Sequence, residues 1–572
     1  MKPKTVKRKL IIGAIILLLE ASVGLGMASG ATIYVDDDNT SGPWDGTLLH
    51  PYQFIQEGID SASAGDTVYV FNGTYYEFVN VYKAINLIGE NKDSTVIHIQ
   101  PTGWYVNISS NRVNLSGFTV QNSNTYGIYV LSDSNTIFNN IVKSGEYARI
   151  YLFGGSYCTV SGNTVIGLGG SVGIKERYGS KNTIIGNLVD NLYWGISSEL
   201  GASNTLISGN TVVNCQAGVY LLSAYNDTII DNTLDSGGIT LHPNDTSLSS
   251  WNTHTIENNY VNGRPIYYYK NNSDTVTVPS NAGQVILANC SNFIIQNLNL
   301  SGVYTAIQLG FSSGNNITGN TLIDNTESGI VLLNSSNNHI VGNSITNNES
   351  NESYGIYLHL FSDSNSILGN TIVAHDIGIY VKNSCFHNII SENTVTGNGT
   401  GIRMVHNAGH TCKDNMVYHN NLINNSQNAY ALERETGANI WDDGYPSGGN
   451  YWSDFDEPGE GAYDENGDGI VDSAYNISGI YNRDRYPLMN PWDGTPITPP
   501  CGDASGDGNI NSADIVRLIN YLFVGGPQPW PALCIGDINT DGYVNSADVS
   551  YLINYLFVGG PAPRNDCCTS LK

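Results

Sequence analysis

The chain has 572 residues, of which 24 are Lys or Arg and 51 are Asp or Glu, so its formal net charge is −27. A protein this negative repels phosphate backbones, which argues against nucleic-acid binding. Hydrophobic residues make up 40% of the sequence, and this content excludes a wholly disordered chain. Because only 13% of the residues are charged, we expect the excess acid at a few cation sites.

The first thirty residues have the features of a secretory signal peptide. A basic start precedes an apolar run from Leu10 to Leu19, which is too short to span a bilayer, and small residues follow from Ala28 to Ala31. We expect residues 1–30 to be removed and the mature protein to be secreted or held at the cell surface, with no transmembrane helix. The alternative is an uncleaved signal anchor that continues to Met27.

A repeat of about 23 residues begins near residue 114. One anchor is Gly followed by Ile or Val, as at Gly355, Gly378 and Gly401. Apolar and polar residues alternate after it, which is typical of strands. A second anchor is an Asn at a recurring position near an aliphatic residue, and its copies are Asn140, Asn163, Asn187, Asn210, Asn232, Asn297, Asn320, Asn343, Asn370 and Asn393.

This period predicts a parallel β-helix, an all-β solenoid in which each coil pairs with the coils before and after it. We expect inward Ile, Val and Leu to form the core and the recurring Asn side chains to stack at a turn, hydrogen-bonded along the axis. Residues 53–63 have helical apolar spacing and predict an N-terminal helix that caps the first coil. An antiparallel sandwich fits the fixed period poorly.

Three short segments between residues 32 and 90 resemble a known family. They are Tyr34–Asp38, Ile55–Asp60 and Asn72–Tyr75, and together with the coils they resemble the NosD-type right-handed β-helix proteins. That family is named for a periplasmic copper-binding protein and overlaps the carbohydrate-binding and sugar-hydrolysis repeats. Residues 441–454 resemble the C-terminal end of archaeal surface members. The resemblance implies the right-handed fold more firmly than it implies an activity.

The C-terminal region contains two copies of one calcium-binding pattern, residues 502–529 and 536–563. Oxygen side chains occupy positions 1, 3, 5, 9 and 12 of each loop, position 7 supplies a backbone carbonyl, and Gly at position 6 allows the sharp turn. An amphipathic helix follows each loop. The expected calcium ligands are Asp503, Ser505, Asp507, Asn509, Asn511 and Asp514 in the first loop, and Asp537, Asn539, Asp541, Tyr543, Asn545 and Asp548 in the second.

Two loop–helix units of this kind resemble a type I dockerin, a small α-helical calcium-binding domain. The resemblance implies a cohesin-like protein as partner, contacted through loop positions 10 and 11. These positions are Ser512 and Ala513 in the first copy, and Ser546 and Ala547 in the second. Because both copies carry the same residues, the domain could dock in two orientations related by a half-turn.

The motifs divide the chain into six segments. Residues 1–30 are the signal peptide, 31–92 the N-terminal cap and first coils, and 93–430 the β-helix repeats. Residues 431–489 form a C-terminal cap, 490–500 a Pro-rich linker, and 501–568 the dockerin domain.

A third calcium loop is predicted within the C-terminal cap. Asp464, Asn466, Asp468, Ile470 and Asp472 occupy positions 1, 3, 5, 7 and 9 of the same pattern, without an acid at position 12. The alternative is an Asx-rich turn that binds no metal.

The nine cysteines suggest one disulfide. Cys501 and either Cys567 or Cys568 could join the two ends of the dockerin domain. The remaining cysteines of the solenoid are scattered singly and are expected as small core or turn residues. Soft ligands also gather over residues 404–419, namely Met404, His406, His410, Cys412, Met416 and His419. Their irregular spacing makes a copper site unlikely.

The outward position two residues after the recurring Gly suggests a carbohydrate contact. It holds Tyr357, Tyr380 and Arg403 on consecutive coils, and Tyr rings stack on sugars. Tyr129 and Tyr220 share this position on earlier coils. We expect these side chains to face solvent. Ordinary packing between coils is the alternative.

The sequence leaves three readings of the function open. The first is an exported β-helix that binds or processes polysaccharide and is attached by its dockerin, with a role in polysaccharide catabolism. The second is a non-catalytic surface or adhesion rod, and the third is a copper-delivery accessory. No polygalacturonase or pectate lyase signature is found, so enzymatic activity stays uncertain. If the chain is an enzyme, it is a polysaccharide lyase or O-glycosyl hydrolase.

Overall fold

The computed structural model describes residues 30–99, 105–242, 246–348, 352–406, 411–432, 439–465, 467–479, 482–495, 500–530, 532–563 and 567–569. The predicted signal peptide lies outside these residues except for Gly30. The chain divides into a first unit of residues 1–215 and 219–233 and a second unit of residues 216–218 and 234–572. Among the described residues, no helix has both the length and the apolar character needed to cross a membrane.

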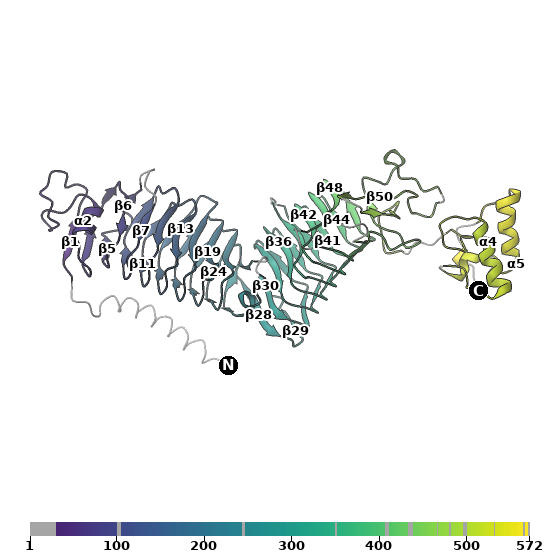
Figure 1. Ribbon diagram of the computed structural model, residues 1–572, viewed down its shortest axis with the longest axis horizontal. Coiled ribbons are helices and arrows are strands. Elements are labelled where there is room, and N and C mark those ends of the chain that lie inside the picture. The colour runs from purple at the N-terminus through teal and green to yellow at the C-terminus, as the bar shows by residue number, and fades with distance from the viewer. Residues whose placement is uncertain are drawn as a thin grey trace. The chain divides into compact units, whose positions relative to one another are not determined.

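The first unit is a β-solenoid whose short strands stack in register (Figure 1). Ile137, for example, lies between Leu115 of the preceding coil and Val160 of the next coil, and all three strands are parallel. One sheet contains β1 (Thr32–Val35), β2 (Thr67–Val70), β5 (Asn86–Gly89), β8 (Asn114–Ser116), β11 (Thr136–Phe138), β14 (Thr159–Ser161), β17 (Thr183–Ile185), β20 (Leu206–Ser208) and β23 (Thr228–Ile230).

Two further parallel sheets complete each coil of the first unit. One contains β3 (Gly73–Tyr75), β6 (Thr95–His98), β9 (Thr119–Gln121), β12 (Ile141–Val142), β15 (Thr164–Ile166), β18 (Leu188–Asp190) and β21 (Thr211–Val213). The other has the longest strands and contains β4 (Asn80–Val81), β7 (Val106–Ile108), β10 (Tyr126–Val130), β13 (Ala148–Phe153), β16 (Val172–Arg177), β19 (Trp194–Glu199) and β22 (Ala217–Leu222).

A short helix, α2 (Ile55–Ser61), lies beside β1 and β2 at the start of the first unit. Ile55 and Ile59 are fully buried. A Cβ atom on Gly58 would lie 2.7 Å from Val35, so only glycine allows the helix to pack this closely. The helix matches the sequence prediction, and its capping role stays a prediction.

The second unit also contains three parallel sheets. The first has β29 (Val276–Thr277), β31 (Phe293–Gln296), β34 (Asn316–Thr318), β37 (His339–Val341), β40 (Ser366–Leu368), β43 (Ile389–Ser391) and β46 (Met416–Tyr418). The second has β32 (Asn299–Ser301), β35 (Thr321–Ile323), β38 (Ser344–Thr346), β41 (Thr371–Val373), β44 (Thr394–Thr396), β47 (Asn421–Ile423) and β49 (Tyr451–Trp452).

The third sheet of the second unit again has the longest strands. It contains β28 (Arg264–Asn272), β30 (Gln284–Cys290), β33 (Thr305–Gly310), β36 (Ser328–Leu333), β39 (Tyr354–His359), β42 (Ile377–Lys382), β45 (Thr400–Val405), β48 (Gln427–Ala431) and β51 (Ser478–Gly479). The smaller elements between and after the coils are β24 (Thr233–Leu234), β25 (Ile239–Leu241), α3 (Ser249–Asn252), β26 (Thr255–Glu257), β27 (Tyr260–Val261), η1 (Pro458–Glu460), β50 (Tyr475–Asn476) and β52 (Arg483–Asp484).

The recurring Asn forms a buried hydrogen-bond ladder, as the sequence predicts. In the first unit the Asn163 Oδ1 accepts the backbone N–H and the side-chain Nδ2 of Asn140 at 3.0 and 3.2 Å, and Asn187 repeats this toward Asn163. In the second unit the ladder runs through Asn320, Asn343, Asn370, Asn393, Asn420 and Asn450. Each amide satisfies buried backbone groups at a turn that no strand ladder can reach.

The residue before each ladder Asn except Asn450 adopts a left-handed backbone, with φ of 61° at Gly162 and 63° at Gly186. Glycine adopts this conformation without a Cβ clash, which explains the recurring Gly-Asn pair. Asn297 was predicted as a ladder member, and this prediction is wrong. It occupies the left-handed position instead, and the backbone N–H of Leu298 donates to Asn320.

A second Asn ladder in the second unit was not predicted. It runs through Asn315, Asn338, Asn365, Asn388, Asn415 and Asn439, and all of these except Asn439 lie five residues before a member of the first ladder. The fixed offset between the two Asn positions was visible in the sequence and could have revealed it.

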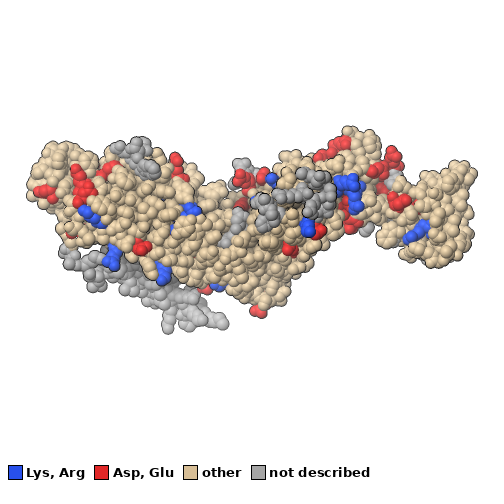
Figure 2. All heavy atoms as spheres, in the orientation of Figure 1, with Lys and Arg blue, Asp and Glu red and all other residues tan. Residues whose placement is uncertain are grey.

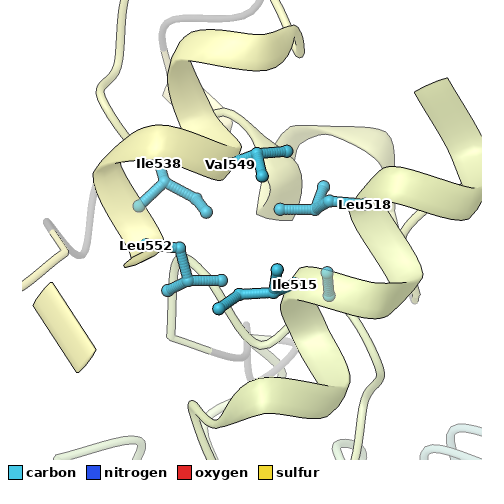
Figure 3. Packing of buried hydrophobic residues seen from close by; sticks show 6 residues of the cluster. Ile515, Leu518, Ile538, Val549 and Leu552 are labelled. Carbon is cyan, nitrogen blue, oxygen red and sulfur yellow. The ribbon is translucent and has the colours of Figure 1, made fainter. Parts of the chain in front are cut away.

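The C-terminal region folds as two loop–helix copies. Ile515 and Leu518 of α4 pack against Val549 and Leu552 of α5, and Ile538 completes this core (Figure 3). The elements are α4 (Ser512–Ile519), η2 (Asn520–Val524), η3 (Leu533–Gly536), α5 (Ser546–Ile553), η4 (Asn554–Val558) and η5 (Cys567–Thr569). Ile519 and Ile553, at the ends of the two helices, are 37% and 40% exposed.

Candidate functional site

The first predicted calcium loop is held by its own carboxylates. Asp503 accepts the backbone N–H groups of residues 506, 507 and 508 at 2.9, 3.1 and 3.0 Å. Asp514, at position 12, accepts the N–H of Ser505 at 2.8 Å and that of Asn511 at 2.7 Å. The loop is therefore closed from both ends around oxygen side chains.

The second loop repeats this arrangement. Asp537 accepts the N–H groups of Asp541 and Gly542 at 3.0 and 2.9 Å, and Asp548 accepts those of Asn539 and Asn545 at 3.2 and 2.8 Å. Asn511 and Asn545 also cap helices α4 and α5 by accepting from Ala513 and Ala547. Each loop thus positions the helix that follows it.

The charges of these loops fit a cation. Asp503, Asp514, Asp537 and Asp548 are buried. Burial raises the pKa of Asp514 and Asp548, and the neighbouring position-1 carboxylate raises it further. Among the described residues of the dockerin region the only Lys or Arg is Arg517, which donates to the Gln528 carbonyl. Hard oxygen ligands without a nearby cationic partner are suited to Ca²⁺.

The third predicted loop has part of the same geometry. Asp464 accepts the N–H groups of Gly467, Asp468 and Gly469 at 2.7, 3.1 and 2.9 Å, as Asp503 does in the first loop. Asp472 accepts the N–H of Glu465 at 2.8 Å. Asn466 lies outside the described residues. In the second loop, the Asp at position 12 accepts the backbone N–H of the residue at position 2. In the third loop, Asp472 accepts the equivalent N–H from position 9.

Across the described part of the chain, no three His, Cys, Asp or Glu side chains are gathered as a metal site. The assignment of calcium therefore depends on loop geometry and charge. The suspected copper ligands fit poorly. His410 lies outside the described residues, while the ring of His419 stacks on Trp492 with centroids 3.6 Å apart and its Nε2 lies 2.8 Å from the Ser447 carbonyl oxygen.

The predicted partner-binding residues are exposed on the dockerin surface. Ser512, Ala513, Ser546 and Ala547 all lie in the first turns of α4 and α5. Large apolar side chains continue these faces in equivalent positions of the two copies. Phe523 is 66% exposed and Phe557 is 68% exposed, and Val524 and Val558 lie beside them in sequence.

The cysteines form two disulfides in the dockerin region, Cys501–Cys567 and Cys534–Cys568. The first selects one of the two predicted alternatives. Within the solenoid the five remaining cysteines are all buried, as expected of core residues, and Cys385 and Cys412 lie close together. The bridge between Phe386 and Lys413 aligns them on neighbouring coils. Burial raises the pKa of the Cys385 thiol, and its hydrogen bond with Cys412 raises it further.

The Tyr–Tyr–Arg ladder has the predicted register. Tyr357 pairs with Tyr380 on the next strand, Tyr380 with Arg403, and Arg403 with Tyr430. The prediction that the two tyrosines face solvent is wrong, because Tyr357 is 4% and Tyr380 8% exposed. On the earlier coils, Tyr220 is also buried and Tyr129 is half-buried.

The neighbouring aromatic rings explain this burial. The rings of Tyr357 and Tyr380 stack on each other with centroids 5.0 Å apart, and Tyr354 lies over both at 5.1 and 5.2 Å. Their faces are therefore already covered by aromatic contacts. Arg403 is half-buried, with its guanidinium 5.8 Å from the Tyr380 ring centroid and 5.5 Å from that of Tyr430.

The sequence analysis missed an equivalent face on the first unit. On the long-strand sheet, Lys175 and Arg177 of β16 lie among aromatic residues of β13 and β19, and Lys175 forms a buried ion pair with Glu199. The sequence signal was present, because Tyr151, Lys175 and Ser197 occupy one register.

Comparisons with known proteins agree with this architecture. Residues 59–272 and 262–457 match the family model described as periplasmic copper-binding protein (NosD). Residues 501–557 match the type I dockerin domain. No curated protein matches the chain.

Several solved structures are similar in fold at low sequence identity. The Dettilon tailspike protein is 15% identical, with 68% of this chain and 69% of that chain covered and a TM-score of 0.30. The GH136 lacto-N-biosidase from Eubacterium ramulus is 10% identical over 58% and 68% of the two chains, with a TM-score of 0.33. At such scores these similarities carry no argument about activity.

The family matches span residues 59–457 and the dockerin match follows them without overlap. The solenoid coils occupy the first region, and the two loop–helix copies occupy the second. The chain therefore belongs to the NosD family and carries a type I dockerin domain after its β-solenoid.

Proposed function

We propose that this protein is an exported β-solenoid that binds polysaccharide and is attached, through its calcium-loaded dockerin domain, to a cohesin-bearing partner. The observation that carries the proposal is the duplication in the dockerin region. Both copies have a closed acidic loop, and both expose the same residues on the helix that follows. An extracellular or cell-surface location fits the predicted signal peptide and the disulfides.

Calcium has a structural role in this proposal. Asp503, Asp507 and Asp514 would hold one ion together with Ser505, Asn511 and the backbone carbonyl of Asn509, and the second loop would hold another through the equivalent residues. The ion compensates the buried carboxylates and thereby fixes the first turn of each helix. The face that begins at Ser512 or Ser546 is then presented to the partner.

The polysaccharide part of the proposal depends on the long-strand sheets. Charge is sparse over most of the surface drawn in Figure 2, in keeping with a chain of which 13% is charged. Several of the cations on these sheets lie against aromatic rings, as Arg403 does with Tyr430. Arg403 remains the candidate glycan contact of the second unit. Tyr380, which contacts its guanidinium, and Tyr357, which stacks on Tyr380, would hold it in position.

The docking proposal is tested by measuring the binding of the full chain to a panel of immobilised type I cohesin modules. We expect binding in calcium and none in excess chelator. Ala513→Arg or Ala547→Arg alone should each leave binding largely intact, because the other copy can dock after a half-turn. The double variant should lose it. Binding that persists in chelator would contradict the proposal.

A binding rod and an enzyme are distinguished by product release. Reducing-sugar release indicates a hydrolase, and ultraviolet absorbance from unsaturated products indicates a lyase. Glycan binding without either product supports a non-catalytic rod. Absence of glycan binding would leave only the attachment function.

A further inference from the structure

A buried charge cluster lies on the long-strand sheet of the first unit. The Lys175 Nζ is 2.8 Å from the Glu199 carboxylate on the next coil, and their side chains are 4% and 5% exposed. Arg177 is the direct register partner of Glu199. Two cations and one carboxylate therefore share one outward face. Glu176 belongs to a different set of contacts, because its carboxylate accepts from Asn182 and Thr205 in the interior.

Aromatic rings flank this cluster on both sides. On one side a continuous line of rings crosses the sheet from Tyr147 through Tyr151 and Phe153 to Tyr178, with neighbouring centroids 5.6 to 5.8 Å apart. On the other side Trp194 stacks on Tyr220 with centroids 3.9 Å apart.

The cations lie between these rings. The Lys175 Nζ is 4.8 Å from the Tyr147 ring centroid and 5.9 Å from that of Trp194. Tyr147 and Tyr178, at the two ends of the ring line, are 43% and 54% exposed. The rim of the cluster is therefore accessible although its centre is buried.

Three hydrogen-bond donors of this face have no partner among the residues that the structure describes. They are the Arg177 Nε, the Trp194 Nε1 and the Ser197 Oγ, and all three atoms are buried. A buried unsatisfied donor destabilises the folded state, and native proteins rarely keep several in one place. Their concentration beside an accessible aromatic rim indicates a position for a ligand rich in hydrogen-bond acceptors.

We propose that this face, formed by Arg177, Trp194, Ser197 and the rings from Tyr147 to Tyr178, binds an acidic sugar unit of a polysaccharide. The inference rests on the proposed polysaccharide binding and gives it a location and a substrate class. Aromatic rings stack on the apolar face of a sugar, and the free N–H and O–H groups donate hydrogen bonds to its oxygens. The guanidinium suits a carboxylate because its N–H groups match two oxygens at once.

Charge favours a uronate over a neutral sugar at this face. The outward side chains of β16 and β19 carry one net positive charge on a protein whose net charge is −27. Neighbouring coils are about 4.8 Å apart, close to the length of one sugar ring. Consecutive sugar units of a polysaccharide can therefore contact successive coils of the sheet.

The test is calorimetric titration of the full chain with short oligomers of galacturonate, mannuronate and guluronate. Each oligomer is paired with its carboxyl-reduced counterpart, which keeps the sugar backbone and loses the charge. We expect at least one acidic oligomer to bind about ten- to a hundredfold more tightly than its reduced form. Arg177→Gln should remove this preference, whereas Tyr178→Ser should weaken both forms alike.

The matched control is Lys83→Gln, which removes a half-buried cation 5.3 Å from the Tyr82 ring centroid, outside the proposed face, and should leave affinity unchanged. Thermal melts show whether each variant is folded, and Tyr178→Ser alters only an exposed rim residue. Equal affinity for acidic and reduced oligomers, or a loss of the preference in Lys83→Gln but not in Arg177→Gln, overturns this inference while polysaccharide binding stands. Failure to bind any glycan overturns both.

Discussion

Asp503 and Asp514 close the first dockerin loop from its two ends, and both carboxylates are fully buried. The charge of Asp503 contributes to the raised pKa of Asp514, after the larger effect of burial. Two buried acids in one loop repel each other unless a cation lies between them. The loop geometry therefore implies that metal binding and folding of this region are coupled.

We expect the dockerin region to lose structure when calcium is removed. Without the ion, the repulsion among the loop carboxylates outweighs the small core between α4 and α5. Hydrogen exchange of the full chain should show protected amides in residues 505–553 with calcium and rapid exchange in chelator. Asp514→Asn should weaken the calcium response, and Asp493→Asn, at an exposed linker carboxylate, should not. Unchanged protection in chelator would refute the coupling.

The β-solenoid should be largely independent of that calcium. Its stability comes from stacked aliphatic residues and buried Asn ladders, neither of which involves a metal. Thermal melts of residues 31–489 with and without chelator should differ by a few degrees at most, because only the loop from Asp464 to Asp472 would lose an ion. Collapse of the whole solenoid on chelation would show that this loop supports more of the fold than its contacts suggest.

Most of the fold was predictable because the repeat constrains it strongly. A fixed period with alternating apolar residues leaves few architectures other than stacked coils, and Gly162 and Asn163 show why the turn residues recur. The two acidic loops of the C-terminal region were equally predictable, because their Asp residues recur at fixed positions and close each loop through backbone hydrogen bonds. In both cases a local rule determines the geometry.

The outer faces were not predictable in the same way. Register placed Tyr357 beside Tyr380 correctly, yet side-chain exposure depends on how bulky neighbours such as Tyr354 fold over the sheet. Such contacts form between side chains of neighbouring coils, and the repeat pattern in the sequence does not show which side chains they bury. The same reason hid the pair of Lys175 and Glu199, which are neighbours only because of the coil spacing.

Two buried acids of the first unit should make its stability depend on pH. Burial raises the pKa of Glu176 to about 7 and that of Asp227 to about 8. The folded state therefore holds protons that the unfolded chain releases near pH 4, so stability falls as pH rises from about 4 to about 8. Glu176→Gln keeps the acceptor for Asn182 and removes one titration.

We expect the melting temperature of the wild type to fall between about pH 5 and pH 8.5 by several degrees more than that of Glu176→Gln. Glu146→Gln is the control, because this carboxylate is exposed and has no resolved interaction with the buried pair. Parallel pH curves for wild type and Glu176→Gln would show that Glu176 is ionised throughout.

Breaking the ion pair between Lys175 and Glu199 should lower the stability strongly, whereas replacing both residues with apolar ones should lower it only a little. Lys175→Met leaves Glu199 buried without its partner, and a buried pair broken in this way typically loses about 3–5 kcal/mol. The double variant Lys175→Met/Glu199→Leu removes both charges and retains apolar contacts with Tyr147 and Trp194, so most of the loss should be recovered. Denaturant unfolding of the full chain, monitored by hydrogen exchange in residues 172–199, gives the free energy of unfolding of the wild type and of both variants. If the double variant is as unstable as Lys175→Met, the instability comes from lost packing of the lysine stem, and the pair itself contributes little.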